Sequence, residues 1–394
     1  MGGEKHMSRQ HTEGERGFVS LFTVIFFMLL ITIITVGFLR IMAIEQRQSL
    51  DNDLTASANA AAQSGIEDAK RAIIKYNSLS NGDPLKAQLE AALTSSECDA
   101  LTGNNSIRTA LNLNSSGSVN TQLNQYYTCL SVNLNTPDYI GDASNGKSEF
   151  IPLVTEDGHQ FSEISVSWHL ASPTVGKDGD GQPARYAPGL LLPPVTGGVN
   201  SWSSQGYPAY LRVQLYGYPE GNFGRAKMDQ QTHTIFLVPN TSSNAAAVGS
   251  TTPVNFETVD PRGTDQNKIN LVGVKCSDTP PNLPVGTYAC TARLELPTGQ
   301  PSTSNNYYLR VTPVYSSTHF RLQLFQGSNV VNFSGVEPLI DSTGRASDVF
   351  RRVQSRVRLD NLNNLPEYNV ESAGDICKNM QVSDGSYYQP NNCP

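Results

Sequence analysis

This chain of 394 residues has few charged residues and none of the common signatures of a catalytic site. Asp, Glu, Lys and Arg make up 16% of it, against roughly 25% in average soluble domains. The histidines are scattered without H-E-x-x-H spacing, and there is no G-x-S-x-G, Walker loop or G-x-G-x-x-G. The absence of C-x-x-C argues against a redox site or a zinc ribbon. We therefore expect neither an enzyme nor a cofactor-dependent protein.

The net charge of −7 argues against a dedicated nucleic-acid binder, because phosphate contacts need a basic face. One basic cluster, Arg351, Arg352, Arg356 and Arg358, admits two interpretations: a patch that contacts DNA, or the solvated face of a strand. Valines alternate with these arginines, which favours the strand face.

A calcium-binding loop is the one kind of metal site for which the sequence offers candidate residues. Asp178 and Asp180 lie in a D-x-D-G run that resembles the start of an EF-hand loop. Counting from Asp178, however, the fifth position is Gln182 and the twelfth is Gly189, where the loop needs Asp or Asn and then Glu. Asp178 and Asp180 are weak calcium candidates, and a Gly/Asp turn explains the run as well.

The feature that stands out is the stretch from Phe18 to Leu39, which contains no charged side chain. At about 1.5 Å per residue, a helix of this length crosses a bilayer core of roughly 30 Å. The stretch is too long for an ordinary secretory h-region, and helix-forming residues from Arg40 to Arg47 follow it instead of an A-x-A cleavage site. We expect one membrane-spanning helix with an exported body.

The helical pattern continues beyond this stretch. Apolar and small residues recur at spacings of three and four, which predicts an amphipathic helix as far as residue 75. Small residues on such a stripe allow helices to approach closely, as packing in a filament requires. The residues of this stripe are Leu50, Leu54, Ala58, Ala61, Gly65, Ala69 and Ile73.

The start of the chain resembles a type IV prepilin. A short polar leader ends in Glu15-Arg16-Gly17, and the apolar helix starts at once with Phe18. The cluster of charged residues and the Ala-rich stretch that follow are similar to the helix of PilX-like minor pilins. The resemblance covers residues 14–75, and the hydropathy alone would equally support a plain signal anchor.

This resemblance implies where the chain is processed and what it contacts. Gly17 would be the last residue of the leader and Phe18 the N-methylated first residue of the mature chain, after cleavage by a prepilin peptidase. The charged cluster consists of Arg40, Glu45 and Arg47, and we expect it to take part in assembly. The implied partners are other pilins in a helical filament and the inner-membrane assembly platform. The chain would be a single-pass membrane protein before assembly and part of a surface pilus, or fimbrium, afterwards.

Phe22 departs from the pattern of the major pilins. These subunits carry Glu at the fifth mature position, where it pairs with the N-terminal amine of a neighbour. Phe22 occupies that position here, and GspK-like members also lack the glutamate. Because an unpaired amine in an apolar core is costly, we expect a minor pilin that acts in filament initiation or at the tip. A tip-displayed adhesin for a surface or host ligand and a type II secretion pseudopilin remain alternatives.

The cysteines are even in number, which suits an oxidising compartment. Of the fifteen possible pairings, the simplest joins each cysteine to the next one along the chain. These pairs are Cys98–Cys129, Cys276–Cys290 and Cys377–Cys393.

The rest of the chain predicts antiparallel β structure after the long helix, and so an α+β fold. Alternating runs start at Glu163, Ala209 and Thr232 and recur after residue 267, with turn signals between them. A short helix is expected at Pro84–Leu93. The expected segments are a leader at 1–17, the helix at 18–75, an αβ pilin-like domain at 76–240, a linker at 241–253, a second β domain at 254–360 and a disulfide-closed tail at 361–394.

Overall fold

The chain divides into two compact units, which we describe separately. The computed structural model describes residues 16–113, 124–156, 159–170, 202, 207–219, 232–241, 248–249, 251–256, 271–277, 286–297 and 305–358. The first unit contains residues 1–132 and 340–355, and the second contains residues 133–339 and 356–394.

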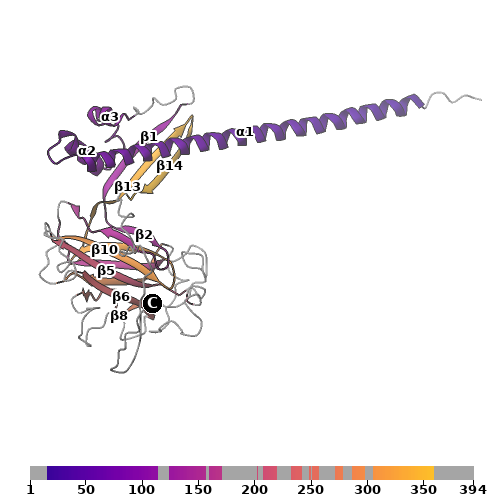
Figure 1. Cartoon of the computed structure of the whole chain (residues 1–394). Helices are drawn as coiled ribbons and strands as arrows, with labels where there is room; N and C mark the ends of the chain where they lie inside the picture. Colours follow the sequence, from indigo (N-terminus) through magenta and orange to yellow (C-terminus); the bar gives the residue numbers. More distant parts are fainter. Residues whose placement is uncertain are drawn as a thin grey trace, which may run out of the picture. The chain divides into compact units, whose positions relative to one another are not determined.

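The first unit is built on a single long helix. Helix α1 (Arg16–Ser78) is followed by α2 (Pro84–Thr94) and α3 (Asn105–Leu111). The side chain of Asp83 caps α2 by accepting a hydrogen bond from the amide of Leu85 at 2.8 Å. Strands β1 (Gln125–Thr136), β13 (Phe333–Ala346) and β14 (Val349–Arg356) form a sheet with the order β1-β13-β14. The last turns of α1 lie across this sheet (Figure 1).

Small residues bring α1 very close to the sheet. A Cβ atom on Gly65 would lie 2.3 Å from Oγ of Ser342 in β13. Ala58, Ala62, Ala69 and Ala72 on the same helix are fully buried. Such close approach is possible because none of these positions carries a side chain larger than a methyl group.

The second unit is a mostly antiparallel sheet that nearly closes on itself. Its path runs in the order β12-β11-β4-β9-β8-β6-β5-β10-β3. Strand β2 pairs with β11 and also contacts β3 and β10, so that the two ends of the path meet. The strands are β2 (Tyr139–Ala143), β3 (Glu149–Pro152), β4 (Glu163–Leu170), β5 (Tyr210–Pro219), β6 (Thr232–Thr241), β7 (Val254–Asn255), β8 (Leu271–Cys276), β9 (Tyr288–Glu295), β10 (Asn305–Val314), β11 (Thr318–Gln326) and β12 (Asn329–Val331).

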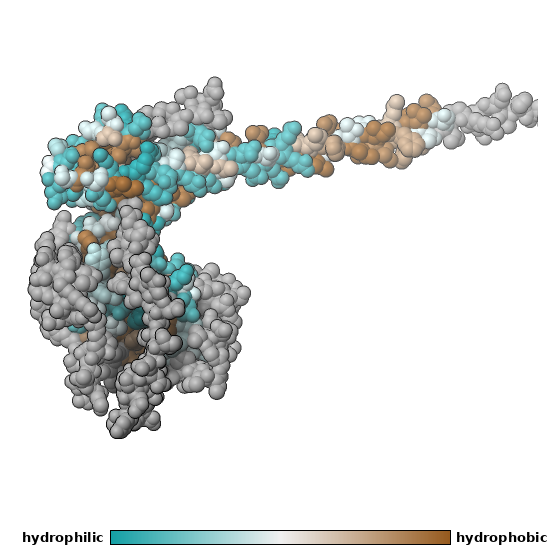
Figure 2. All heavy atoms as spheres, in the orientation of Figure 1, coloured by the Kyte–Doolittle hydropathy of each residue, from teal (hydrophilic) through white to brown (hydrophobic). Residues whose placement is uncertain are grey.

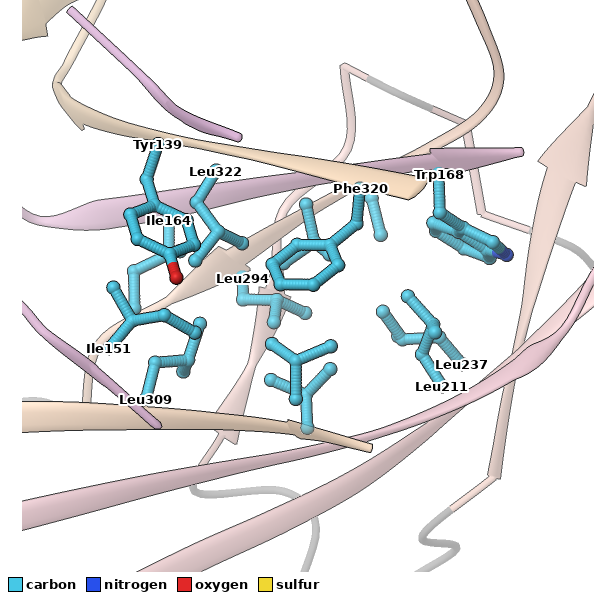
Figure 3. Close-up of a cluster of buried hydrophobic side chains, with 14 of the residues drawn as sticks. Tyr139, Ile151, Ile164, Trp168, Leu211, Leu237, Leu294, Leu309, Phe320 and Leu322 are labelled. Atoms are coloured by element: carbon cyan, nitrogen blue, oxygen red, sulfur yellow. The ribbon is translucent and has the colours of Figure 1, made fainter. Parts of the chain in front are cut away.

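Alternate residues of these strands fill the interior of the sheet (Figure 3). Trp168 on β4 and Phe320 on β11 are fully buried, and the indole Nε1 of Trp168 donates to the carbonyl of Ala209 at 2.9 Å. The ring of Phe320 lies over Gly141, where a Cβ atom would be 2.3 Å from Cζ of the ring. The second unit therefore has its own hydrophobic core.

The structure agrees with the expected α+β class, an N-terminal apolar helix followed by mostly β structure. The short helix expected at Pro84–Leu93 is α2, and the run expected at Glu163–Leu170 is β4.

The expected division of the body at residues 241–253 differs from the observed one. Strands β6 and β8 flank that segment and pair in parallel within one sheet, with Val238 opposite Gly273. Residues 76–240 and 254–360 are thus not separate units. The β13 and β14 segment returns to the N-terminal helix, a long-range pairing that local sequence patterns do not reveal. The expected tail at 361–394 lies outside the described residues.

Two of the three expected disulfides are present. Cys98 is bonded to Cys129 with a Cα–Cα distance of 4.6 Å, and Cys276 is bonded to Cys290 with a Cα–Cα distance of 4.2 Å. Cys276 and Cys290 face one another directly on β8 and β9. Cys377 and Cys393 lie outside the described residues.

Candidate assembly helix

The N-terminal half of α1 is an apolar helix whose described side chains make almost no contact with the rest of the chain. Every side chain from residue 20 to residue 53 is exposed, and Phe22 is 68% exposed. Brown, apolar side chains cover much of this part of the helix in Figure 2. The helix is long and apolar enough to cross a membrane. A membrane anchor and a signal sequence are both compatible with this observation.

The structure places the predicted site residues along this exposed half without gathering them into one cluster. Gly17 and Phe18 lie in the first turn of α1, and the side chain of Phe18 is outside the described part of the chain. Arg40, Glu45 and Arg47 are all exposed. The structure gives them no ion pair with another described residue. Their charges are therefore available to a membrane surface or to another chain.

The C-terminal half of α1 corrects one prediction. We expected the stripe of small residues to pack against other helices in a filament. Ala58, Ala69 and Ile73 are instead fully buried within the first unit. The chain's own sheet lies against the stripe at Ala58. Leu50 is 61% exposed, so that only the start of the stripe remains available.

Asp68 joins α1 to the sheet and was not singled out from the sequence. The phenol of Tyr127 on β1 donates to Oδ2 of Asp68 at 3.0 Å, and Arg71 forms an ion pair with the same carboxylate. Burial, together with the charge of Asp68, raises the pKa of Tyr127 above its usual value and keeps the phenol protonated as a donor. The signal was available: Asp68 lies three residues after Gly65 on the small stripe, where a charged residue must have a partner.

Two further side-chain contacts hold the same part of α1. The amide of Gln125 on β1 donates to the carbonyl of Ser57 at 3.0 Å. The guanidinium of Arg351 on β14 donates to Oγ1 of Thr55 at 3.1 Å. The contact between α1 and its sheet therefore starts near residue 55 and continues to Asp68.

Three of the four arginines on and after β14 pair with carboxylates. Within the first unit, Nε of Arg352 donates to Asp341 at 2.8 Å, and these hydrogen bonds lower the pKa of Asp341. Within the second unit, Arg356 pairs with Asp138 at 2.7 Å, and Arg358 pairs with Glu149 at 3.2 Å. These pairs favour the interpretation as a structural strand face over a patch that contacts DNA.

The weak calcium candidates Asp178 and Asp180 lie outside the described residues. Among the residues that the structure describes, no group of three His, Cys, Asp or Glu side chains could hold a metal ion.

Comparisons of the chain with protein-family models, with curated proteins and with solved structures found no match.

Proposed function

We propose that this chain is a minor subunit of a type IV pilus, held in the membrane by α1 before assembly and in the filament by the same helix afterwards. The observation that carries the proposal is the continuity of α1, whose 63 residues span roughly 95 Å at about 1.5 Å per residue. Its exposed apolar half and its buried small stripe belong to one helix. A cleavable signal sequence, or a membrane anchor joined to the body by a flexible linker, would not require the helix to continue into the body.

The junction at the start of the helix supports the proposal. A polar leader ending in Gly17 meets an apolar helix that starts with Phe18, the arrangement that a prepilin peptidase recognises. Other pilins and an inner-membrane assembly platform would be the partners. We propose no catalytic role and no cofactor.

Phe22 indicates a rare position in the filament. A phenyl ring cannot neutralise the N-terminal amine of an adjacent subunit, so repeating this subunit along a fibre would leave one unpaired amine per copy in an apolar core. Each such amine costs roughly a few kcal/mol. At a filament end or in the initiating complex the cost occurs once, or exposure to water avoids it.

The test is the abundance of this chain in sheared filaments, measured by quantitative mass spectrometry. We expect far fewer copies than of the principal subunit, and the Phe22→Glu variant to be incorporated more often, because it restores the carboxylate. Phe26→Glu is the matched control, since it adds the same charge one turn further along and should reduce incorporation. Equal abundance of the unmodified chain and the principal subunit would contradict the assignment to a rare position.

A tip-displayed adhesin is the second candidate, favoured by the second unit with its own closed core. Deletion of the gene separates the candidates. Loss of filaments supports a role in assembly, whereas normal filaments with lost attachment support adhesion. Normal filaments and attachment with impaired protein secretion would instead indicate a pseudopilin.

A further inference from the structure

The second unit carries a cavity of about 500 Å³ beside the hairpin of β11 and β12. Its lining comes from two segments: Glu156, His159 and Gln160 before β4, and Gln326 with residues 329–332 at the hairpin. This volume lies within the range of small-molecule sites in proteins.

Hydrogen bonds hold both segments in place. The amide of Asn332 donates to Oε2 of Glu156 at 3.2 Å, and the backbone amide of Glu156 donates to the carbonyl of Asn332 at 3.2 Å. Nη2 of Arg293 donates to the carbonyl of Gly327 at 3.0 Å, which fixes the turn of the hairpin. The cavity is thus built from well-anchored backbone.

Several polar groups in the cavity are nevertheless left without a partner inside the chain. The side-chain amides of Gln160, Gln326 and Asn329 make no hydrogen bond with any described residue and are exposed. Nδ1 of His159 lies 2.6 Å from the carbonyl of Glu156 and therefore donates to it, and Nε2 makes no hydrogen bond with any described residue. Each amide offers a donor and an acceptor side by side, the pattern that neighbouring hydroxyl groups satisfy.

The charges of the described lining residues disfavour anionic ligands. None of the described residues lining the cavity is Lys or Arg, and Glu156 contributes a negative charge. Phosphate, sulfate or carboxylate groups would be repelled there. Val330 and Val331 give the lining an apolar surface, which suits the C–H face of a sugar ring.

We infer that this cavity binds a neutral saccharide, through hydrogen bonds from the amides of Gln326, Asn329 and Gln160 to its hydroxyl groups. The inference goes beyond the proposed role in filament assembly and does not depend on it. It assigns to the second unit a ligand class that a surface-displayed subunit can contact.

The test uses the full chain in a detergent without a sugar head group, applied to an array of neutral, sialylated and sulfated glycans. We expect binding to neutral glycans, competed by the free sugar of the bound glycan. Gln326→Ala and Asn329→Ala should each weaken the affinity about tenfold, the effect of losing one or two hydrogen bonds. Gln323→Ala is the matched control, because Gln323 lies on the same strand but does not line the cavity, and it should leave the affinity unchanged.

Gln326 and Asn329 are exposed, so both variants should keep the melting temperature of the unmodified chain, and that measurement is made alongside. Absence of binding to neutral glycans would overturn the inference, as would binding restricted to acidic glycans or an equal loss in all three variants. Because binding is measured without filaments, failure here is separate from failure of the pilin proposal, which the abundance in filaments tests.

Discussion

A Cβ atom on Gly344 would lie 2.1 Å from the carbonyl oxygen of Ala58. The amide nitrogen of Ala62 would lie 2.3 Å from this Cβ atom. Both neighbours are backbone atoms of α1, so neither can rotate aside as a flexible side chain would. Gly344 in β13 and Ala58 in α1 thus mark the place where the sheet touches the helix backbone directly.

Gly344→Ala should separate α1 from the sheet. The added methyl group overlaps the helix backbone, and we expect a loss of about 3 kcal/mol or more in the stability of the first unit. Hydrogen exchange of the α1 amides from Ala58 to Ile73 measures this directly. Gly249→Ala is the control, since a Cβ atom there meets nothing within 4 Å. Unchanged protection of α1 in Gly344→Ala would contradict the close contact.

Glu337 is the buried centre of an ion network within the second unit. Its Oε2 accepts from the amide of Ile140 at 2.9 Å and from Arg356 at 3.0 Å, while only 4% of its side chain is exposed. Arg356 also pairs with Asp138. Glu337→Gln keeps the shape of the side chain but removes one of the two carboxylates that pair with the half-buried Arg356.

We expect Glu337→Gln to lower the free energy of unfolding of the second unit by about 1.5–3 kcal/mol, because the half-buried Arg356 loses one of its two carboxylate partners and keeps only Asp138. Urea unfolding followed by tryptophan fluorescence measures the change, since Trp168 lies in the core of this unit. Glu295→Gln is the control, because Glu295 makes no ion pair with any residue that the structure describes. A loss no larger than that of the control would show that the network contributes little.

His169 should make the second unit sensitive to acid. The residue is 7% exposed, its Nε2 has no hydrogen-bond partner among the described residues, and burial lowers its pKa from 6.5 to about 4. Between these two pH values the unfolded chain takes up a proton at His169 and the folded chain does not. The free energy of unfolding should therefore fall as the pH drops from 6.5 to 4, by about 3 kcal/mol from this group.

Urea unfolding at pH 4 to 7 compares the unmodified chain with His169→Gln. The variant should show a shallower loss of stability below pH 6.5, whereas His159→Gln, at an exposed position, should keep the slope of the unmodified chain. Parallel slopes for all three proteins would mean that His169 is protonated in the folded state.

The long helix and most strands of the second unit could be predicted because their signals are local. An uninterrupted apolar run specifies α1, and strict alternation specifies β4 and β11, with Ile164, Val166 and Leu322 directed inward. Strand β13 could not be predicted in the same way, since Gly335, Pro338 and Gly344 all argue against a strand.

The sequence left undecided which structural element packs against the small stripe of α1. Ala58 and Ala69 predict close packing on one face of α1, but a second helix and a sheet both satisfy that pattern. Gly344 and Ser342, which approach this face, lie more than two hundred residues away along the chain. The cavity beside this hairpin could not be predicted from the sequence either, because Glu156 and Asn332 come together only when β11 and β12 pair.

The N-terminus of the mature protein tests the pilin assignment most directly. The chain is expressed with a prepilin peptidase and its N-terminus is determined by peptide mass spectrometry, alongside the Gly17→Glu variant. We predict that the mature chain begins with N-methylated Phe18 and that Gly17→Glu remains uncut. A mature chain that retains the leader, or that begins at any other residue, would contradict the assignment.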